Sequence, residues 1–137
     1  MIKVMIGEKG TGKTKALLSA VDEALGAQKG SIVFINKGER HVYQLSHEVR
    51  LINSEEYDID SYRAFYGLLC GIISQNFDIT NIFVDSVGKI VTGGTPEELD
   101  AFLDAAAALS EKFGIEMFFT ISMKQELATE TISKYAI

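Results

Sequence analysis

Cysteine and long apolar runs are scarce in this sequence, and each shortage excludes a class of protein. The 137 residues include one cysteine, Cys70, so the chain cannot form an internal disulfide and gives no sign of an oxidising compartment. We interpret Cys70 as a small core residue. The first apolar run is too short for a signal peptide, and no run approaches the roughly 20 residues that cross a bilayer. We therefore expect a cytoplasmic protein without membrane insertion.

Positive charge is also in short supply. The chain has 13 lysine and arginine residues against 19 aspartate and glutamate residues, a formal net charge of -6. A field of this sign repels polyanions, whereas non-specific nucleic-acid binding needs clustered lysine and arginine. We therefore expect no nucleic-acid partner, with a local basic patch as the alternative. With 47% apolar and 23% charged residues the composition is that of a globular chain, and the length fits one domain over residues 1–137.

Short apolar runs alternate with amphipathic segments along the chain. The apolar runs predict strands at residues 2–6, 31–36, 82–84 and 116–122, with a short edge strand at 49–52. Apolar residues at helical spacing predict helices at residues 13–27, about 60–75 and 95–114, and residues 125–135 are a candidate for a last helix. The third helix has the best defined start, because Thr95, Pro96 and Glu98 match a capping box with proline at the first helical position.

This alternation predicts the fold class. Right-handed crossovers between strands and helices give a mainly parallel sheet with helices on both faces, a three-layer α/β sandwich. In such sheets the ligand lies beyond the carboxyl ends of the strands. Those ends are expected near Ile6, Asn36, Asp85 and Ser122.

The segment between the first strand and the first helix reads GEKGTGKT and matches the pattern G-x-x-x-x-G-K-[S/T]. Gly7, Gly10 and Gly12 allow backbone conformations in which successive N–H groups turn inward around an anion, and the helix adds its positive end. Lys13 would reach the β- and γ-phosphates, and the Thr14 hydroxyl would bind Mg²⁺. The alternative is a glycine-rich turn with a surface lysine.

We therefore predict a site for a Mg²⁺–nucleoside triphosphate. The residues expected to contact the nucleotide are Gly7, Glu8, Lys9, Gly10, Thr11, Gly12, Lys13, Thr14 and Lys15. ATP is preferred to GTP because the guanine-reading NKxD pattern is absent: Asn36 and Lys37 begin it, but Gly38 and Glu39 do not complete it. The purine base itself has no local signature here.

These residues and their setting resemble those of a P-loop NTPase, which implies that family's fold. In that superfamily a second apolar strand ends in an aspartate that holds Mg²⁺, and NIFVDSV, with Asp85, is similar to that strand. An aspartate that only caps a loop is the alternative. Ser86 stands where AAA-type ATPases and many helicases have a catalytic glutamate, so the chain is more similar to a compact RecA-like ATPase.

The resemblance to RecA-like ATPases implies three further roles. The catalytic base would come from just past the second strand, where Glu39 would orient and deprotonate the attacking water; a solvated loop glutamate is the alternative. A γ-phosphate sensor would stand at the end of the fourth strand, where Ser122 is nearest, with Thr120 behind it. Among three arginines, Arg40 is best placed as a finger toward a neighbouring subunit, and surface solvation is the alternative.

Three functions stay open at this level. The first is a small RecA-like ATPase, slow alone and faster in a homo-oligomer or with a protein partner. The second is a nucleotide-binding regulatory module with little turnover. The third is a small phosphotransferase, against which the lack of an arginine-rich lid counts. The histidines, His41 and His47, do not recur at metal-ligand spacing with cysteine, and we assign them no site.

Overall fold

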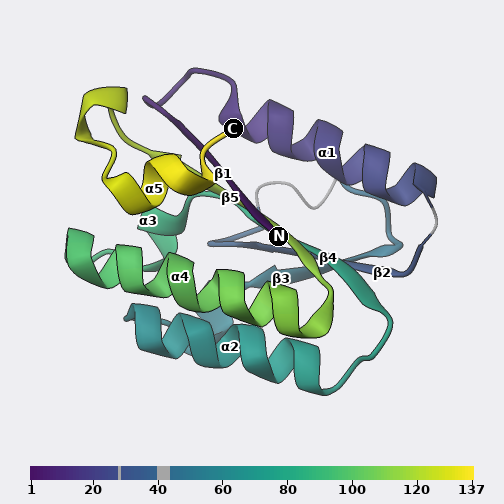
Figure 1. Cartoon of the computed structure of the whole chain (residues 1–137). Helices are drawn as coiled ribbons and strands as arrows, with labels where there is room; N and C mark the ends of the chain where they lie inside the picture. The colour runs from purple at the N-terminus through teal and green to yellow at the C-terminus, as the bar shows by residue number, and fades with distance from the viewer. Residues whose placement is uncertain (28, 40–43) are drawn as a thin grey trace.

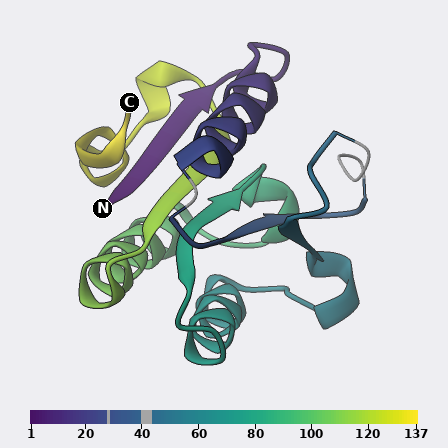
Figure 2. The same cartoon turned by 90° about the vertical axis from the view of Figure 1, so that its right-hand side faces the viewer.

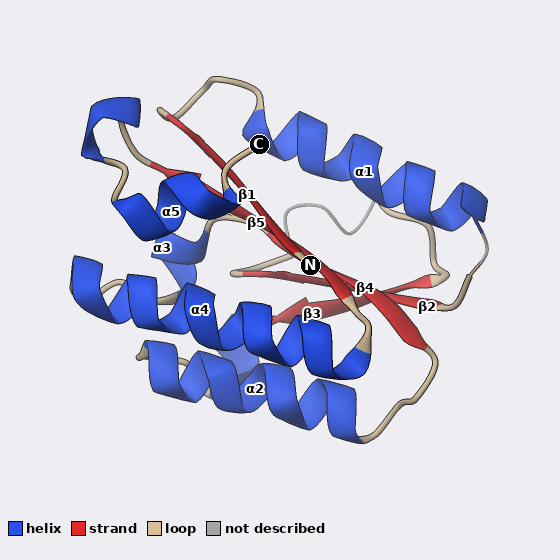
Figure 3. Ribbon diagram, viewed as in Figure 1, coloured by secondary structure: helices blue, strands red, loops and turns tan. Residues whose placement is uncertain are grey.

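All strands of the sheet run in the same direction, as the alternation of elements predicts (Figures 1 and 3). The computed structural model describes residues 1–27, 29–39 and 44–137. Within them the strands are β1 (Ile2–Gly7), β2 (Ser31–Asn36), β3 (Val49–Asn53), β4 (Ile79–Val84) and β5 (Glu116–Ser122). Their order across the five-stranded sheet is β1-β5-β4-β2-β3, so the first and last strands of the chain are neighbours.

Helices cover both faces of this sheet. They are α1 (Lys13–Ala27), α2 (Tyr62–Ser74), α3 (Val87–Ile90), α4 (Pro96–Phe113) and α5 (Glu130–Tyr135). Figure 2 shows α1 on one side of the sheet and α2 with α4 on the other. The prediction of a parallel sheet between two helical layers is therefore confirmed. No helix among the described residues has the length and hydropathy to cross a bilayer.

The core consists of one apolar cluster on each face of the sheet. The cluster under α1 contains Leu17, Val21, Ile32, Phe34, Val49 and Phe83. The larger cluster, under α2 and α4, includes Ile35, Phe65, Leu69, Val84, Phe102 and Phe119. Burying one large apolar side chain contributes about 1.5–3 kcal/mol, so these two clusters hold the three layers together.

The expected start and end of α4 are also confirmed. Thr95 Oγ1 accepts the N–H of Glu98 at 3.1 Å, and Glu98 Oε1 accepts the N–H of Thr95 at 2.9 Å. Gly114 ends the helix with φ +65°, a left-handed conformation that glycine adopts without a Cβ clash. Both ends of the helix are therefore specified by local sequence.

The structure corrects the limits of β4. The strand begins at Ile79 rather than at Ile82, where the apolar run starts. Its polar residue Asn81 is in register with Ile32 on one side and with Glu116 on the other. Backbone pairing with two neighbouring strands therefore extends β4 beyond the segment that hydropathy indicates.

Two other segments also differ from expectation. Residues 87–90, for which the sequence predicts neither strand nor helix, form the single-turn helix α3. Residues 125–135 are not one helix: a 3-10 turn at Gln125–Leu127 precedes α5, and extended backbone at Ala128 separates the two. Thr129 begins α5 instead, because its side chain accepts the N–H of Ile132 at 3.1 Å.

The C-terminal segment packs beside β1 and against α4. Asp104 of α4 accepts hydrogen bonds from Tyr135 Oη at 2.7 Å and from Lys134 Nζ at 3.1 Å. The hydrogen bond from Tyr135 and then that from Lys134 lower the pKa of the Asp104 carboxyl. Ile137 N–H donates to the Val4 carbonyl at 3.0 Å, so the end of the chain covers the edge of β1.

We predict that Asp104→Asn lowers stability at neutral pH and that this difference shrinks in acid. A carboxyl with a lowered folded-state pKa stabilises above its unfolded-state pKa, and this stabilisation is lost as the pH falls through the folded-state value. Urea unfolding near neutrality and near pH 3 measures the difference. Glu23→Gln, at an exposed position on α1, is the control. An equal difference at both pH values would contradict the prediction.

Candidate functional site

The loop between β1 and α1, residues 8–12, has the backbone that its glycines predict. Gly10 and Gly12 both have φ +88°, a region that other residues rarely adopt. At Gly7 the reason for glycine is close packing, because a Cβ there would lie 2.6 Å from Thr11 Oγ1. Each of the three glycines named in the motif therefore has a physical reason. We call residues 8–12 the glycine-rich loop.

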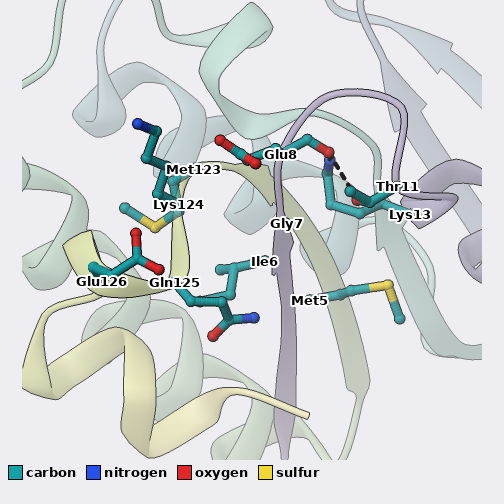
Figure 4. A pocket seen from close by; sticks show the side chains of 10 residues that line it. All are labelled: Met5, Ile6, Gly7, Glu8, Thr11, Lys13, Met123, Lys124, Gln125 and Glu126. Atoms are coloured by element: carbon teal, nitrogen blue, oxygen red, sulfur yellow. Dashed lines mark hydrogen bonds between the residues drawn. The ribbon is translucent and has the colours of Figure 1, made fainter.

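Lys13 is folded back against this loop. Its side chain is only 8% exposed, which is rare for lysine. Its Nζ donates to the Glu8 carbonyl at 2.9 Å, and Thr11 Oγ1 donates to the same carbonyl at 2.7 Å (Figure 4). The ammonium group is therefore held at the loop rather than extended into solvent. The first turn of α1 lies beside it, with N–H groups that have no partner within the helix.

Asp85 lies directly after β4, buried at 1% exposure, and its carboxylate contacts three hydroxyl groups. Thr14 Oγ1 is 3.3 Å from both carboxylate oxygens, although the two residues are 71 positions apart. Thr120 Oγ1 donates to Asp85 Oδ1 at 2.9 Å, and Ser86 Oγ is 3.4 Å from the same oxygen. The structure thus brings together the two residues predicted to bind the metal.

Thr120 has a larger part in this site than its sequence position indicated. It is fully buried, and its hydroxyl both donates to Asp85 and accepts the Ser86 N–H at 2.8 Å. It therefore orients the Asp85 carboxylate and fixes the start of α3. Ser86 has φ 59°, a conformation that is strained for a residue with a Cβ. The sequence placed Thr120 only behind Ser122.

A hollow of about 600 Å³ opens above α1, α3 and the end of β5, within the usual size range of ligand pockets. Its lining residues are Lys9, Gly10, Gly12, Lys13, Thr14, Lys15, Ser86, Gly88, Lys89 and Ser122. Four of them are lysines and none is a carboxylate, in a chain whose net charge is -6. We call this hollow the lysine hollow. Its local charge is opposite to that of the whole protein.

The sequence predicted one of two further lining residues of the lysine hollow and missed the other. Ser122, the candidate sensor, lies in the hollow as expected from its place at the end of β5. Lys89 was not foreseen. In the sequence, Lys89 is marked only by its position four residues after Asp85. This spacing does not predict a place in the hollow unless the position of α3 is known.

A second hollow, of about 550 Å³, borders the glycine-rich loop (Figure 4). Its lining residues are Met5, Ile6, Gly7, Glu8, Thr11, Lys13, Met123, Lys124, Gln125 and Glu126. We call it the methionine hollow. Lys13 lines both hollows, one basic and the other of mixed apolar and polar character.

Glu39 is not brought to either hollow. It is exposed, and neither set of lining residues includes it. The neighbouring Gly38 N–H donates to Asn53 Oδ1 at 2.7 Å, which draws this segment toward β3. Arg40 and His41 lie outside the described residues. His47 is exposed, and the described part of the chain contains no group of three acidic, histidine or cysteine side chains that could hold a metal.

Neither the family models nor the curated proteins match this chain. The five-stranded parallel sheet flanked by helices is compatible with P-loop and Rossmann-like folds. Function is therefore inferred from the geometry of the site.

We predict that Thr120→Val destabilises the protein by about 1–3 kcal/mol, because the Asp85 carboxylate loses one of its hydrogen bonds and the Ser86 N–H loses its Thr120 partner. Valine has the same shape, so lost hydrogen bonds rather than a cavity would cause the effect. Ser122→Ala, at an exposed hydroxyl on the same strand, should change stability by less than about 0.5 kcal/mol. Urea unfolding compares the two variants, and equal stability would show that Thr120 does not hold Asp85.

Proposed function

We propose that the protein binds a Mg²⁺–nucleoside triphosphate, with ATP preferred, and is a small RecA-like ATPase with slow turnover. The observation that carries this proposal is the lysine hollow over the start of α1. A triphosphate is a compact, highly charged anion, and it suits a compartment with four lysines and no lining carboxylate. The N-terminus of a helix adds a favourable dipole and N–H donors.

The oxygen groups beside the hollow suit Mg²⁺. This ion prefers oxygen ligands, keeps several waters and needs one or two carboxylates at most. The Thr14 hydroxyl and the Asp85 carboxylate are 3.3 Å apart, a weak hydrogen bond that a cation could replace. These two residues would hold the ion, and a bound Mg²⁺ would neutralise charge on the β- and γ-phosphate oxygens.

The methionine hollow offers room for the base and sugar of the same nucleotide. Figure 4 shows Ile6 and Met123 on the same side of β1 as Gln125 and Glu126, whereas Met5 points to the other side. Ile6 and Met123 provide apolar surface for a planar ring, and Gln125 and Glu126 provide polar groups at the rim. Ligand pockets commonly combine an apolar lining with a few polar groups. Because Lys13 lines both hollows, one ligand can occupy both, with its phosphates against the glycine-rich loop.

Slow turnover follows from what the lysine hollow lacks. Among the residues that the structure describes, its lining includes neither an arginine to stabilise transition-state charge nor a carboxylate to orient the attacking water, and Arg40 lies outside those residues. Glu39 remains the proposed base, but the segment after β2 must approach the hollow before it can act. The exposed position of Glu39 also favours the second candidate function, a nucleotide-binding regulatory module with little turnover.

We predict that Mg²⁺–ATP raises the thermal midpoint of the wild-type protein by several degrees and that Lys13→Ala abolishes this shift. A ligand at about 100 times its dissociation constant adds roughly 2.7 kcal/mol, which corresponds to a shift of that size for a domain of this length. A panel of ATP, ADP, GTP and tripolyphosphate, with Mg²⁺ or EDTA, identifies the preferred ligand.

The control is Lys29→Ala, because Lys29 is an exposed lysine beyond the opposite end of α1. It should retain the full shift. A full shift in Lys13→Ala would remove the glycine-rich loop from the binding site, and the absence of a shift in the wild type would refute the proposed function.

We predict that phosphate release by the isolated wild-type chain is slower than about 10⁻² per second, as in P-loop proteins without a positioned arginine. Glu39→Gln should lower this rate further without changing affinity for ATP. Glu55→Gln tests a second carboxylate at the same edge of the sheet, after β3, and should leave the rate unchanged. An unaltered rate in Glu39→Gln would exclude it as the base, and no release by the wild type would favour the regulatory module.

A further inference from the structure

The side chain of Asn36 is buried without satisfying its polar groups. The residue has 0% exposure, and neither Nδ2 nor Oδ1 has a hydrogen-bond partner among the described residues. Burying an unpaired amide destabilises a folded protein, and native structures rarely retain such a group without a reason. A water or ligand that pairs with the amide in the working protein is one such reason.

The position of Asn36 points to the candidate metal site. It is the last residue of β2, and the register between Ile35 and Val84 places it beside Asp85. The Asp85 N–H donates to the Ile35 carbonyl at 2.9 Å, which continues the pairing to this point. Adjacent strands lie about 4.8 Å apart, so one water can bridge the two side chains.

Both side chains also face the same layer. Phe34 and Phe83 belong to the cluster under α1, whereas Ile35 and Val84 belong to the opposite cluster. Because successive side chains in a strand alternate between faces, the next alternation directs Asn36 toward the α1 side. Asp85 is on that side, since it contacts Thr14 of α1. The unpaired amide therefore lies beside the carboxylate on the side away from β5.

We infer that Asn36 is a positioning residue of the metal–nucleotide site, which holds a water molecule between β2 and Asp85 in the shell of the bound ion or terminal phosphate. The inference rests on the proposed function. An amide suits this role because it can accept a hydrogen bond from a water and donate one to an oxyanion. It is also uncharged, so it does not repel the Asp85 carboxylate. Water-mediated contacts of this kind are nearly as favourable as direct hydrogen bonds.

The test uses Asn36→Leu, which has the same number and branching of side-chain heavy atoms but is somewhat larger and has no polar atoms. If the amide is unpaired without ligand, the unliganded variant should be at least as stable as the wild type. Its affinity for the β,γ-imido analogue of ATP should fall about tenfold in the presence of Mg²⁺ and stay unchanged in EDTA, because only the hydrated ion and phosphate use the amide. Calorimetric titration gives the affinities, and urea unfolding gives the stability.

Asn53 provides a matched control. It is in register with Asn36 on β3, but its Oδ1 already accepts the N–H groups of Gly38 at 2.7 Å and Glu55 at 3.0 Å. Asn53→Leu should therefore show the reverse pattern, with lower stability and unchanged Mg²⁺-dependent affinity. The pair separates loss of a structural amide from loss of a ligand-binding one.

Several outcomes would overturn the inference. If the unliganded Asn36→Leu variant is less stable than the wild type, Asn36→Ala distinguishes the cause, because alanine is too small to clash. A loss of stability in both variants would mean that the amide has a structural partner. Unchanged Mg²⁺-dependent affinity in both Asn36→Leu and Asn36→Ala would mean that the amide only lines a void or holds a structural water. If the wild type itself fails to bind the analogue with Mg²⁺, the proposed function fails and the inference fails with it.

Discussion

The buried Asp85 carboxylate is the group on which the arrangement of this site depends. A carboxylate with 1% exposure needs hydrogen-bond donors, and it finds hydroxyls from α1, from β5 and at the start of α3. One charged group therefore sets the relative positions of three elements. The same contacts place Thr14, the first turn of α1 and the lysine hollow on one side of the sheet. Stability and the proposed ligand binding thus depend on the same few atoms.

Local patterns in the sequence were enough to predict most of the fold. Glycine spacing predicted the glycine-rich loop, and Thr95 with Glu98 predicted the start of α4, because each depends on residues a few positions apart. Strand order was different. The sequence does not show that β5 lies between β1 and β4, so it could not show that Thr120 contacts Asp85. The predicted pairing of Thr14 with Asp85 depended on a family resemblance rather than on local chemistry.

Glu39 illustrates the limit of reasoning from chain position. Glu39 comes soon after the end of β2, the strand that pairs with β4. The direction of the segment is set by Gly38, with φ +92°, and by the hydrogen bond from Gly38 to Asn53 on the outer strand β3. A side chain on β3 therefore helps to direct the segment that carries Glu39. No pattern in residues 36–39 alone contains this information.

Two energetic costs lie on either side of Asp85. Ser86, which follows it in the chain, has a left-handed backbone that is unfavourable for a residue with a Cβ, and Asn36, beside it in the sheet, has an unpaired buried amide. A leucine at Asn36 or a glycine at Ser86 would relieve each cost if the fold alone mattered. Strain and unsatisfied groups concentrate where a protein binds ligands, because the ligand supplies the missing partners. Both costs occur at the carboxyl edge of a parallel sheet, where such folds bind their ligands, and this coincidence is difficult to explain by packing alone.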